Sequence, residues 1–261
     1  MEYKKTDCKI IFLSINMKYL LTACFFLVYS MVSAQVMLPA YQGVLNKPIA
    51  NANSIITTGL VLNLDASNSS SYPGSGTSWN DISGNNNNAL LNGAVFSSVS
   101  GISYFTCGTN CISANITKSA SMTFSVWAKS SNFSASTMLF NTGDNGVGPD
   151  LLFYLNTIYW NIYDNTASPF TFSPAANISN WHNYTVVNDA TSNAKLYIDG
   201  VFKASATYRS NIATTTLSIG GGGGNTNKWI GEIANFQAYN RVLTASEVLQ
   251  NFNSLKGGFG L

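Results

Sequence analysis

The sequence has few charged residues: Asp, Glu, Lys and Arg make up 9% of its 261 residues, and there is one histidine. Residues 1–34 hold four of the 13 basic and two of the 11 acidic residues, so nine of each sign remain beyond them. A chain with no net charge and so little Lys and Arg lacks the basic surface that nucleic acids and anionic membranes bind. We therefore expect neither as a partner.

Cysteine is also scarce, because only Cys107 and Cys111 follow residue 34, in the segment "CGTNC". These two and the distant His182 are too few for a zinc site with four ligands. A redox-active pair is more typically spaced C-x-x-C. For an exported chain we predict a disulfide between Cys107 and Cys111 that closes a tight hairpin.

Glutamate is nearly absent beyond residue 34, where only Glu232 and Glu247 occur. A retaining glycosidase needs two carboxyl groups about 5–5.5 Å apart. Glu247 is taken by a predicted helix cap, and the expected neighbours of Glu232 on its strand face are Ala234 and Phe236. No aspartate forms an E-x-D or D-x-D pair. We predict that the chain is not an enzyme, and a glycoside hydrolase remains the least favoured alternative.

A leader is present at the N-terminus. From Met17 the sequence "MKYLLTACFFLVYSMVSAQ" places a lysine before an apolar stretch that ends in the small residues Val32-Ser33-Ala34. This order is typical of a secretory signal, and the stretch is shorter than the ~20 residues of a membrane-spanning helix. We expect residues 1–34 to be a signal peptide, with residues 1–16 an over-extended start. The mature protein is then secreted or held at the cell surface, without a transmembrane segment.

Beyond an N-terminal extension or linker at residues 35–57, the pattern is one of short strands. Runs such as "GLVLNLDA", "MTFSVWAK", "DLLFYL" and "HNYTVVND" are rich in β-branched and aromatic residues and are separated by turn signals. This pattern predicts one all-β domain at 58–261, a two-sheet antiparallel sandwich. In "KLYIDGVFKA" the pair Asp199-Gly200 predicts a type I′ hairpin turn, with Leu196, Ile198 and Phe202 in or near the core.

One short helix is predicted near the C-terminus. Thr244 and Glu247 have the spacing of a reciprocal capping pair, and Val248, Phe252 and Leu255 follow at helical spacing. Gly257 is a natural C-terminal stop. We expect the helix to cover one end of the sandwich rather than to build a site.

Several motifs follow one another in a familiar order: "GLVLNLDASNSS", "WHNYTVVND", "AKLYIDGV", "LSIGGG" and "WIGEIANFQAYNRVLTASEVLQNF". Together they resemble the laminin-G-like, concanavalin A-like lectin-glucanase jelly-roll domains, over roughly residues 58–256. The resemblance implies a jelly roll with loops gathered at its rims. Its members include sugar-binding modules, adhesion domains and some glycoside hydrolases, so the function has to be argued from the site.

The best-equipped stretch for sugar binding is "LLFYLNTIYWNIYD", because sugars pack on aromatic rings and bond to amides. With Ile158, Trp160 and Ile162 toward the core, a ligand-binding patch is predicted on the opposite face, from Tyr154, Tyr159, Asn161 and Tyr163. The alternative is that this face is an ordinary solvent-facing sheet or a second packing layer.

Calcium is suggested by the resemblance, because many relatives hold an ion at one rim. The loop "GDNGVGPD" brings together Asp144, Asn145 and Asp150, oxygen ligands of the kind that Ca²⁺ prefers. A turn made of Asp, Asn and Gly also forms without an ion, so both interpretations stay open. Taken together, the sequence predicts a secreted or surface, non-catalytic binding module for a glycan or another surface ligand, with a role in adhesion. A structural or protein-interaction domain without sugar binding is the alternative.

Overall fold

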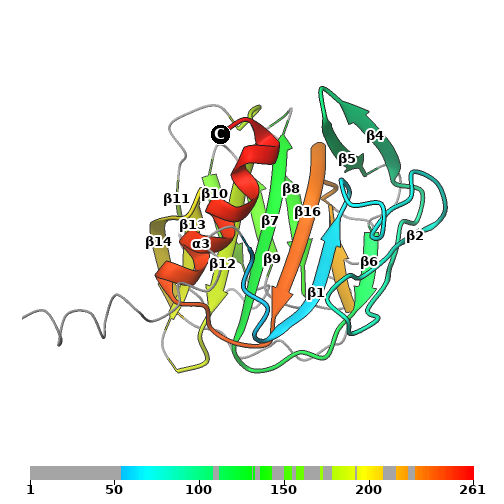
Figure 1. The fold of residues 1–261 in the computed structure, drawn as a ribbon. Coiled ribbons are helices and arrows are strands. Elements are labelled where there is room, and N and C mark those ends of the chain that lie inside the picture. The colour runs from blue at the N-terminus through cyan, green and yellow to red at the C-terminus, as the bar shows by residue number, and fades with distance from the viewer. Residues whose placement is uncertain are drawn as a thin grey trace, which may run out of the picture. The chain divides into compact units, whose positions relative to one another are not determined.

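The computed structural model describes residues 54–107, 112–130, 132, 136–142, 150–154, 157–161, 171–172, 178–191, 193–207, 216–222 and 227–261. They belong to one compact unit, residues 52–261. Two antiparallel sheets of eight strands each form this unit, with one short α-helix near the C-terminus (Figure 1). The predicted all-β jelly-roll sandwich is thereby confirmed. No helix in these ranges is long and apolar enough to cross a membrane.

Sheet A carries the helix. Its order is β14 (Val201–Thr207), β13 (Asn193–Ile198), β12 (His182–Asn188), β7 (Met122–Ser130), β16 (Gly231–Tyr239), β5 (Ile102–Thr106) and β4 (Val95–Val99). Its eighth strand, β1 (Leu60–Asp65), also pairs with β16. β5 takes the first part of that edge of β16, and β1 takes the rest. The two strands therefore follow each other along one edge of β16.

Sheet B forms the other layer. Its order is β11 (Thr171–Phe172), β10 (Thr157–Asn161), β9 (Asp150–Tyr154), β8 (Thr137–Asn141), β15 (Thr216–Ile219), β6 (Ile112–Asn115), β3 (Ala89–Leu90) and β2 (Ser78–Trp79). Side chains of the two facing surfaces make the main core, among them Phe124 and Phe236 from sheet A and Phe140, Phe153 and Ile158 from sheet B. In β12, for example, the alternate residues Tyr184 and Val186 belong to this core, as the sequence pattern predicts.

The strand β7 is buried on both faces, although its sequence alternates. Phe124, Val126 and Ala128 enter the main core. Trp127 points to the opposite face, yet it is fully buried because its ring stacks on Phe259, with centroids 4.0 Å apart. The outer face of sheet A is therefore a second packing layer.

The helix α3 (Ala245–Leu255) provides this second layer. The Thr244 hydroxyl accepts from the Glu247 N–H while the Glu247 carboxylate accepts from the Thr244 N–H, which confirms the predicted capping box. α3 lies across the outer face of sheet A (Figure 1), so the expectation that it covers one end of the sandwich was wrong. Gly257 is not the stop either. The chain continues as the 3₁₀ helix η2 (Lys256–Phe259), which is capped by Gly260 with the left-handed φ of +76°.

The turn at Asp199-Gly200 joins β13 and β14. Both residues have positive φ, +53° and +74°, which confirms the predicted type I′ turn. A two-residue turn pairs Tyr197 with Phe202, and paired residues share a face. Phe202 therefore packs on the ring of Tyr197 on the outer side and is 52% exposed. The expectation that Phe202 lies in or near the core was wrong.

The Asn-rich loop before β3 is organised by one carboxylate. Asp81 is buried, and its two oxygens accept hydrogen bonds from the backbone N–H groups of Asn63, Ser83 and Asn87 and from the Ser83 hydroxyl. Four bonds saturate the acceptor capacity of a carboxylate. The side chain therefore holds the loop together and offers no free oxygen for chemistry.

Candidate functional site

The aromatic patch predicted on β9 and β10 is described in part. Ile158 and Trp160 are buried in the core, as expected, and the half-buried Tyr159 alternates with them toward the outer face of sheet B. Tyr154 lies opposite Thr157 and Asn161 opposite Asp150 in the β9–β10 register. The side chains of Tyr154 and Asn161, and all of Tyr163, lie outside the described residues. The patch stays a prediction.

The predicted calcium ligands are likewise described only in part, because Asp144 and Asn145 lie outside the described residues. Asp150 begins β9 and is 2% exposed. Burial raises the pKa of its carboxyl to about 8, and the side chain of Asn141 opposes this shift. Among the residues that the structure describes, no three His, Cys, Asp or Glu side chains are grouped so as to hold a metal ion. Calcium therefore stays a prediction as well.

The predicted disulfide cannot be followed across the hairpin, since Cys111 lies outside the described residues. Cys107 follows β5, and its Sγ lies 3.7 Å from the carbonyl oxygen of Ile219 on β15. This contact brings the thiol near the end of β15, an inner strand of sheet B. The bond between Cys107 and Cys111 stays a prediction.

Both glutamates of the domain are engaged with cations. Glu232 Oε2 lies 2.6 Å from Lys129 Nζ, its neighbour across the β16–β7 pair. Glu247 binds both terminal nitrogens of Arg241, which lowers the pKa of its carboxyl to about 2. A general acid in a glycosidase needs a raised pKa and a partner carboxylate. The pKa of Glu247 is shifted the opposite way, and the charged partner that the structure gives Glu232 is a lysine.

His182 and Asp199 form a close pair at the β13–β14 turn. Asp199 Oδ2 lies 2.7 Å from His182 Nδ1, and Oδ1 accepts the N–H of Asn183. The aspartate thus serves the turn and also holds the imidazole. The partners that the structure gives it belong to the scaffold, which fits the interpretation of Asp199 as a turn residue.

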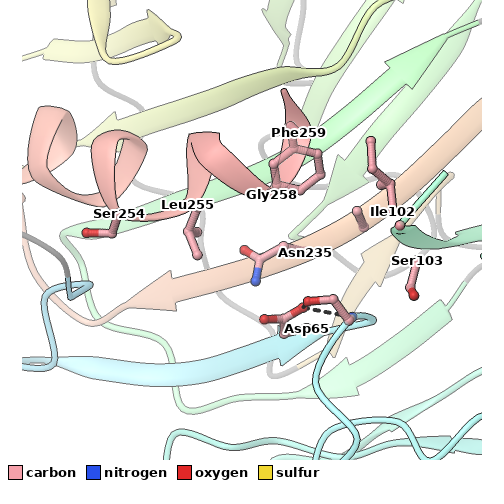
Figure 2. A pocket seen from close by; sticks show the side chains of 11 residues that line it. Asp65, Ile102, Ser103, Asn235, Ser254, Leu255, Gly258 and Phe259 are labelled. Carbon is pink, nitrogen blue, oxygen red and sulfur yellow. Dashed lines mark hydrogen bonds between the residues drawn. The ribbon is translucent and has the colours of Figure 1, made fainter. Parts of the chain in front are cut away.

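A pocket of about 280 Å³ opens on the outer face of sheet A, beside the end of α3 (Figure 2). It lies where β1 ends and β5 begins along the edge of β16. Its lining comes from these strands, from the turn before β5 and from α3 and η2: Asp65, Ser67, Gly101, Ile102, Ser103, Ala234, Asn235, Ser254, Leu255, Gly258 and Phe259. The helix that was expected to build no site therefore forms one wall of this one.

Two polar side chains face each other across the floor of the pocket. Asp65 at the end of β1 lies directly opposite Asn235 on β16. Asp65 Oδ1 accepts hydrogen bonds from the backbone N–H and the hydroxyl of Ser67, an Asx turn that fixes the carboxylate. Asn235 is 3% exposed, and its buried Oδ1 accepts no hydrogen bond from the described residues. A buried amide oxygen without a donor destabilises the fold.

The wall above them is apolar. Phe259 from η2 and Leu255 from α3 face the pocket in Figure 2, together with Ile102 from β5. Phe259 is held in place, because its ring lies nearly parallel to that of Trp127, at 4°, and contacts that of Trp181 as well. The ring is therefore a fixed surface.

Sequence reasoning missed this pocket because a β-bulge creates it. Strict alternation would place Ala234 and Phe236 on the face of Glu232, but the register against β7 shifts between Ile233 and Asn235. After the shift, Asn235 opposes Trp127 on the outer face and Phe236 enters the core. The expectation for Phe236 was wrong for this reason. No glycine or proline in "EIANFQ" marks the bulge.

Comparison with protein families identifies the family of this chain. The laminin-G family model described as the concanavalin A-like lectin/glucanases superfamily matches residues 103–249, more than half of the chain. The chain belongs to this family. No curated protein matches it. The resemblance predicted from the sequence is thereby confirmed. In this laminin-G-like domain the C-terminal helix lines a pocket.

The solved structures similar to this laminin-G-like domain include toxin binding domains. The binding domain of Paraclostridial Mosquitocidal Protein 1 has 19% identity and a TM-score of 0.57, over 75% of this chain and 52% of that one. The binding domain of botulinum neurotoxin DC, solved in complex with SialylT, has 14% identity and a TM-score of 0.59, over 76% and 52%. The binding domain of botulinum neurotoxin DC, solved in complex with rat synaptotagmin II, has 15% identity and a TM-score of 0.59, over 77% of this chain and 52% of that one. The chain thus spans about half the length of these domains, and the likeness shows the fold.

Proposed function

We propose that this protein is an exported, non-catalytic module that binds a glycan or another surface ligand. The observation that carries the proposal is the outer-face pocket, the set of eleven residues around Asp65 and Asn235, in which polar side chains lie beside an apolar wall. A concave site with a few polar groups and an apolar lining is the usual form of a ligand site. The signal-like residues 1–34 support export.

The neighbouring proteins support a binding role. The similar solved structures include binding domains, one of which was solved with SialylT and also with rat synaptotagmin II. The ion pairs Lys129–Glu232 and Arg241–Glu247 support a role without catalysis, because each neutralises a carboxylate that a hydrolase would need. The fold alone supports neither role, since this superfamily includes both lectins and glucanases.

A glycan array probed with the purified protein tests the proposal. We expect binding to a restricted set of glycans and no release of reducing sugar from a polysaccharide panel. Tyr159→Ala, on the outer face of sheet B, tests the predicted aromatic patch in the same assay. Hydrolysis that vanishes in Glu232→Gln would instead identify a glycoside hydrolase. An array without binding, from a protein with an intact fold, would contradict glycan recognition.

A protein-interaction domain is the second candidate. Val201 and Phe202 lie on β14, at the edge of sheet A, and both are more than half exposed. Exposed apolar side chains on an edge strand favour pairing with another chain. Measurement of the mass in solution by size-exclusion chromatography with light scattering separates the candidates. A stable oligomer that Phe202→Lys converts to a monomer would favour this second function.

A further inference from the structure

We propose that the free edge of β4 is a self-association surface, at which β4 of a second copy of the chain pairs antiparallel and extends sheet A. This inference goes beyond the proposed ligand binding and does not depend on it. Three observations carry it: β4 lacks the protection that the other edge strands have, two of its residues direct their backbone groups away from the sheet, and its sequence is complementary to its own copy.

Three other edge strands are protected against pairing with a further strand. β2 and β11, at the two edges of sheet B, have two residues each. β14 lies at one edge of sheet A, where its register against β13 shifts next to Tyr197 and Lys203 is the extra residue of the bulge. Very short length, a bulge and a lysine are features that keep an edge strand from accepting another strand.

β1 also has one side that no strand takes, and the Asn-rich loop covers that side. The Asn87 amide donates to the carbonyl oxygen of Val61, and the Asp81 carboxylate accepts the N–H of Asn63. Covering an edge with a loop is a further way to block pairing. The fold therefore protects this edge as well.

β4 has none of these forms of protection among the residues that the structure describes. It lies at the opposite edge of sheet A from β14 (Figure 1). Its five residues, "VFSSV", include no charge and no proline, and its register against β5 is continuous. β4 is therefore the edge of sheet A that is open to another strand.

The turn between β4 and β5 determines which backbone groups of β4 are free. Ser100 and Gly101 both have positive φ, +54° and +83°, as in a two-residue hairpin turn. The residues that flank such a turn form a hydrogen-bonded pair, and hydrogen-bonded and non-hydrogen-bonded pairs alternate from there. Phe96 and Ser98 fall in the non-hydrogen-bonded pairs, so their N–H and C=O groups point away from β5. No described backbone group outside β5 bonds to them.

β4 is complementary to its own copy about Ser97. Two-fold antiparallel pairing about this residue places Phe96 opposite Ser98 of the second copy, so the free backbone groups of both residues are paired. Phe96 packs toward the core, so Val95 and Val99 face the outer side, where they are 58% and 57% exposed. Each valine then lies opposite the other valine of the second copy in a non-hydrogen-bonded pair, in which side chains are closest.

The charges also favour a second copy of this chain as the partner. No Asp, Glu, Lys or Arg lies between Asp81 and Lys118 in the sequence, a span that includes β3, β4, β5 and β6. A two-fold axis brings each side chain near its own copy, so a charged edge repels itself and this neutral edge does not. In the corresponding pairing of β14, Lys203 would approach Lys203 of the second copy.

The length of β4 sets the expected strength of the dimer. Five residues of strand span about 17 Å. A pair of strands this short buries less than the ~1,200 Å² of a stable interface. We therefore expect a Kd on the order of 100 μM, with a monomer in dilute solution.

Sedimentation equilibrium of the full protein between about 10 μM and about 1 mM tests the inference. We expect the mean mass to rise toward that of a dimer. Ser97→Lys places two like charges on residues whose Cα atoms are about 4.5 Å apart, and should raise the Kd at least tenfold. Ser97→Glu alone should do the same. An equimolar mixture of the two variants should associate at least as tightly as the wild type, because opposite charges then meet.

Phe202→Lys is the matched control, because it adds the same charge at an exposed position on the opposite edge of sheet A. It should leave the association unchanged. A protein that stays monomeric over the whole range would overturn the inference, as would association that persists in Ser97→Lys. Loss of association in Phe202→Lys alone would assign the interface to β14. A mixture of the two Ser97 variants that stays monomeric, with both folded by circular dichroism, would refute pairing about Ser97.

Discussion

Asp65 and Asn235 stand directly opposite each other on β1 and β16, and both side chains line one pocket on the outer face of sheet A. Neither residue is remarkable in the sequence, where 170 positions separate them. The pair exists because β1 ends at Asp65 and because the bulge in β16 turns Asn235 outward. The predictions below follow from this pair and from the other carboxylates of the domain.

Replacing Asn235 should separate stability from binding. Asn235→Leu keeps the volume and removes a buried oxygen that has no donor among the described residues, so we expect the free energy of unfolding to stay equal or to rise by up to about 1 kcal/mol. Urea unfolding of the free protein measures this. A loss of several kcal/mol would show that Asn235 is a structural residue instead.

Replacing Asp81 should destabilise the fold. Asp81→Ala leaves the N–H groups of Asn63, Ser83 and Asn87 without their acceptor, at a cost of about 3 kcal/mol. The exposed Asx turn of Asp189 provides the comparison, and Asp189→Ala should cost less than about 1 kcal/mol. Thermal unfolding of both variants gives the difference, and similar losses would contradict the role assigned to the buried carboxylate.

Glu247 should stabilise the fold in a pH-dependent way. Its pKa is lowered from 4.5 to about 2 by Arg241, so its contribution is complete above about pH 4.5 and is lost as the pH falls toward 2. At pH 7 we expect Glu247→Gln to be less stable than the wild type by about 1–2 kcal/mol, after allowance for solvent screening. Unfolding at pH 7, 4 and 2 should show that the difference in the free energy of unfolding between the wild type and Glu247→Gln becomes smaller as the pH falls. A constant gap would mean that the charge is not responsible.

Ionisation of Asp150 should lower the free energy of unfolding, whereas ionisation of Glu247 raises it. Burial raises the pKa of Asp150 from 3.8 to about 8, so the stability that the protonated carboxyl contributes is complete below about pH 4 and is lost progressively as the pH rises through 8. Asp150→Asn should remove this fall and exceed the wild type by about 2 kcal/mol at pH 9. Unfolding at pH 6 and 9 in the presence of a chelator provides the measurement. If millimolar CaCl₂ restores the wild type at pH 9 but does not affect Asp150→Asn, the predicted calcium site gains support.

Asp199→Asn should preserve the turn but lower the free energy of unfolding. Asn adopts the φ of +53° readily, whereas the charge-assisted hydrogen bond to His182 is lost. We expect Asp199→Asn to lower the free energy of unfolding by about 1 kcal/mol and to leave ligand binding unchanged. In the His182→Gln background the same change should have a smaller effect. Loss of affinity with an intact fold would return Asp199 to the candidate site residues.

Much of the fold could be predicted from local chemistry. The Asp199-Gly200 turn, the Thr244–Glu247 capping box and the shared face of Val248, Phe252 and Leu255 each depend on residues close in sequence. The order of the strand motifs was enough to indicate the family. Phe202 was misplaced because the phase of β14 depends on its pairing with Tyr197 across the turn.

The pocket could not be predicted, because it depends on two non-local features. One is the bulge beside Ala234, which reverses the phase of β16 without any marker in the sequence. The other is the path of α3 and η2, since the stacking of Phe259 on Trp127 sets where the helix end lies. The sequence did offer Trp127, an aromatic residue on the polar face of an alternating strand, as a sign that this face is covered.

The central claim is that the outer-face pocket binds the ligand. Its most direct test is a ¹H–¹⁵N NMR titration of the full protein with glucose, galactose, mannose and N-acetylglucosamine. The side-chain amide signal of Asn235 reports on the pocket, and the ring of Tyr159, followed by ¹H–¹³C spectra, reports on the outer face of sheet B. We expect a saturable shift of the Asn235 amide signal that Asp65→Asn abolishes, with no change at Tyr159. Saturable shifts at Tyr159 with Asn235 unmoved would contradict the account.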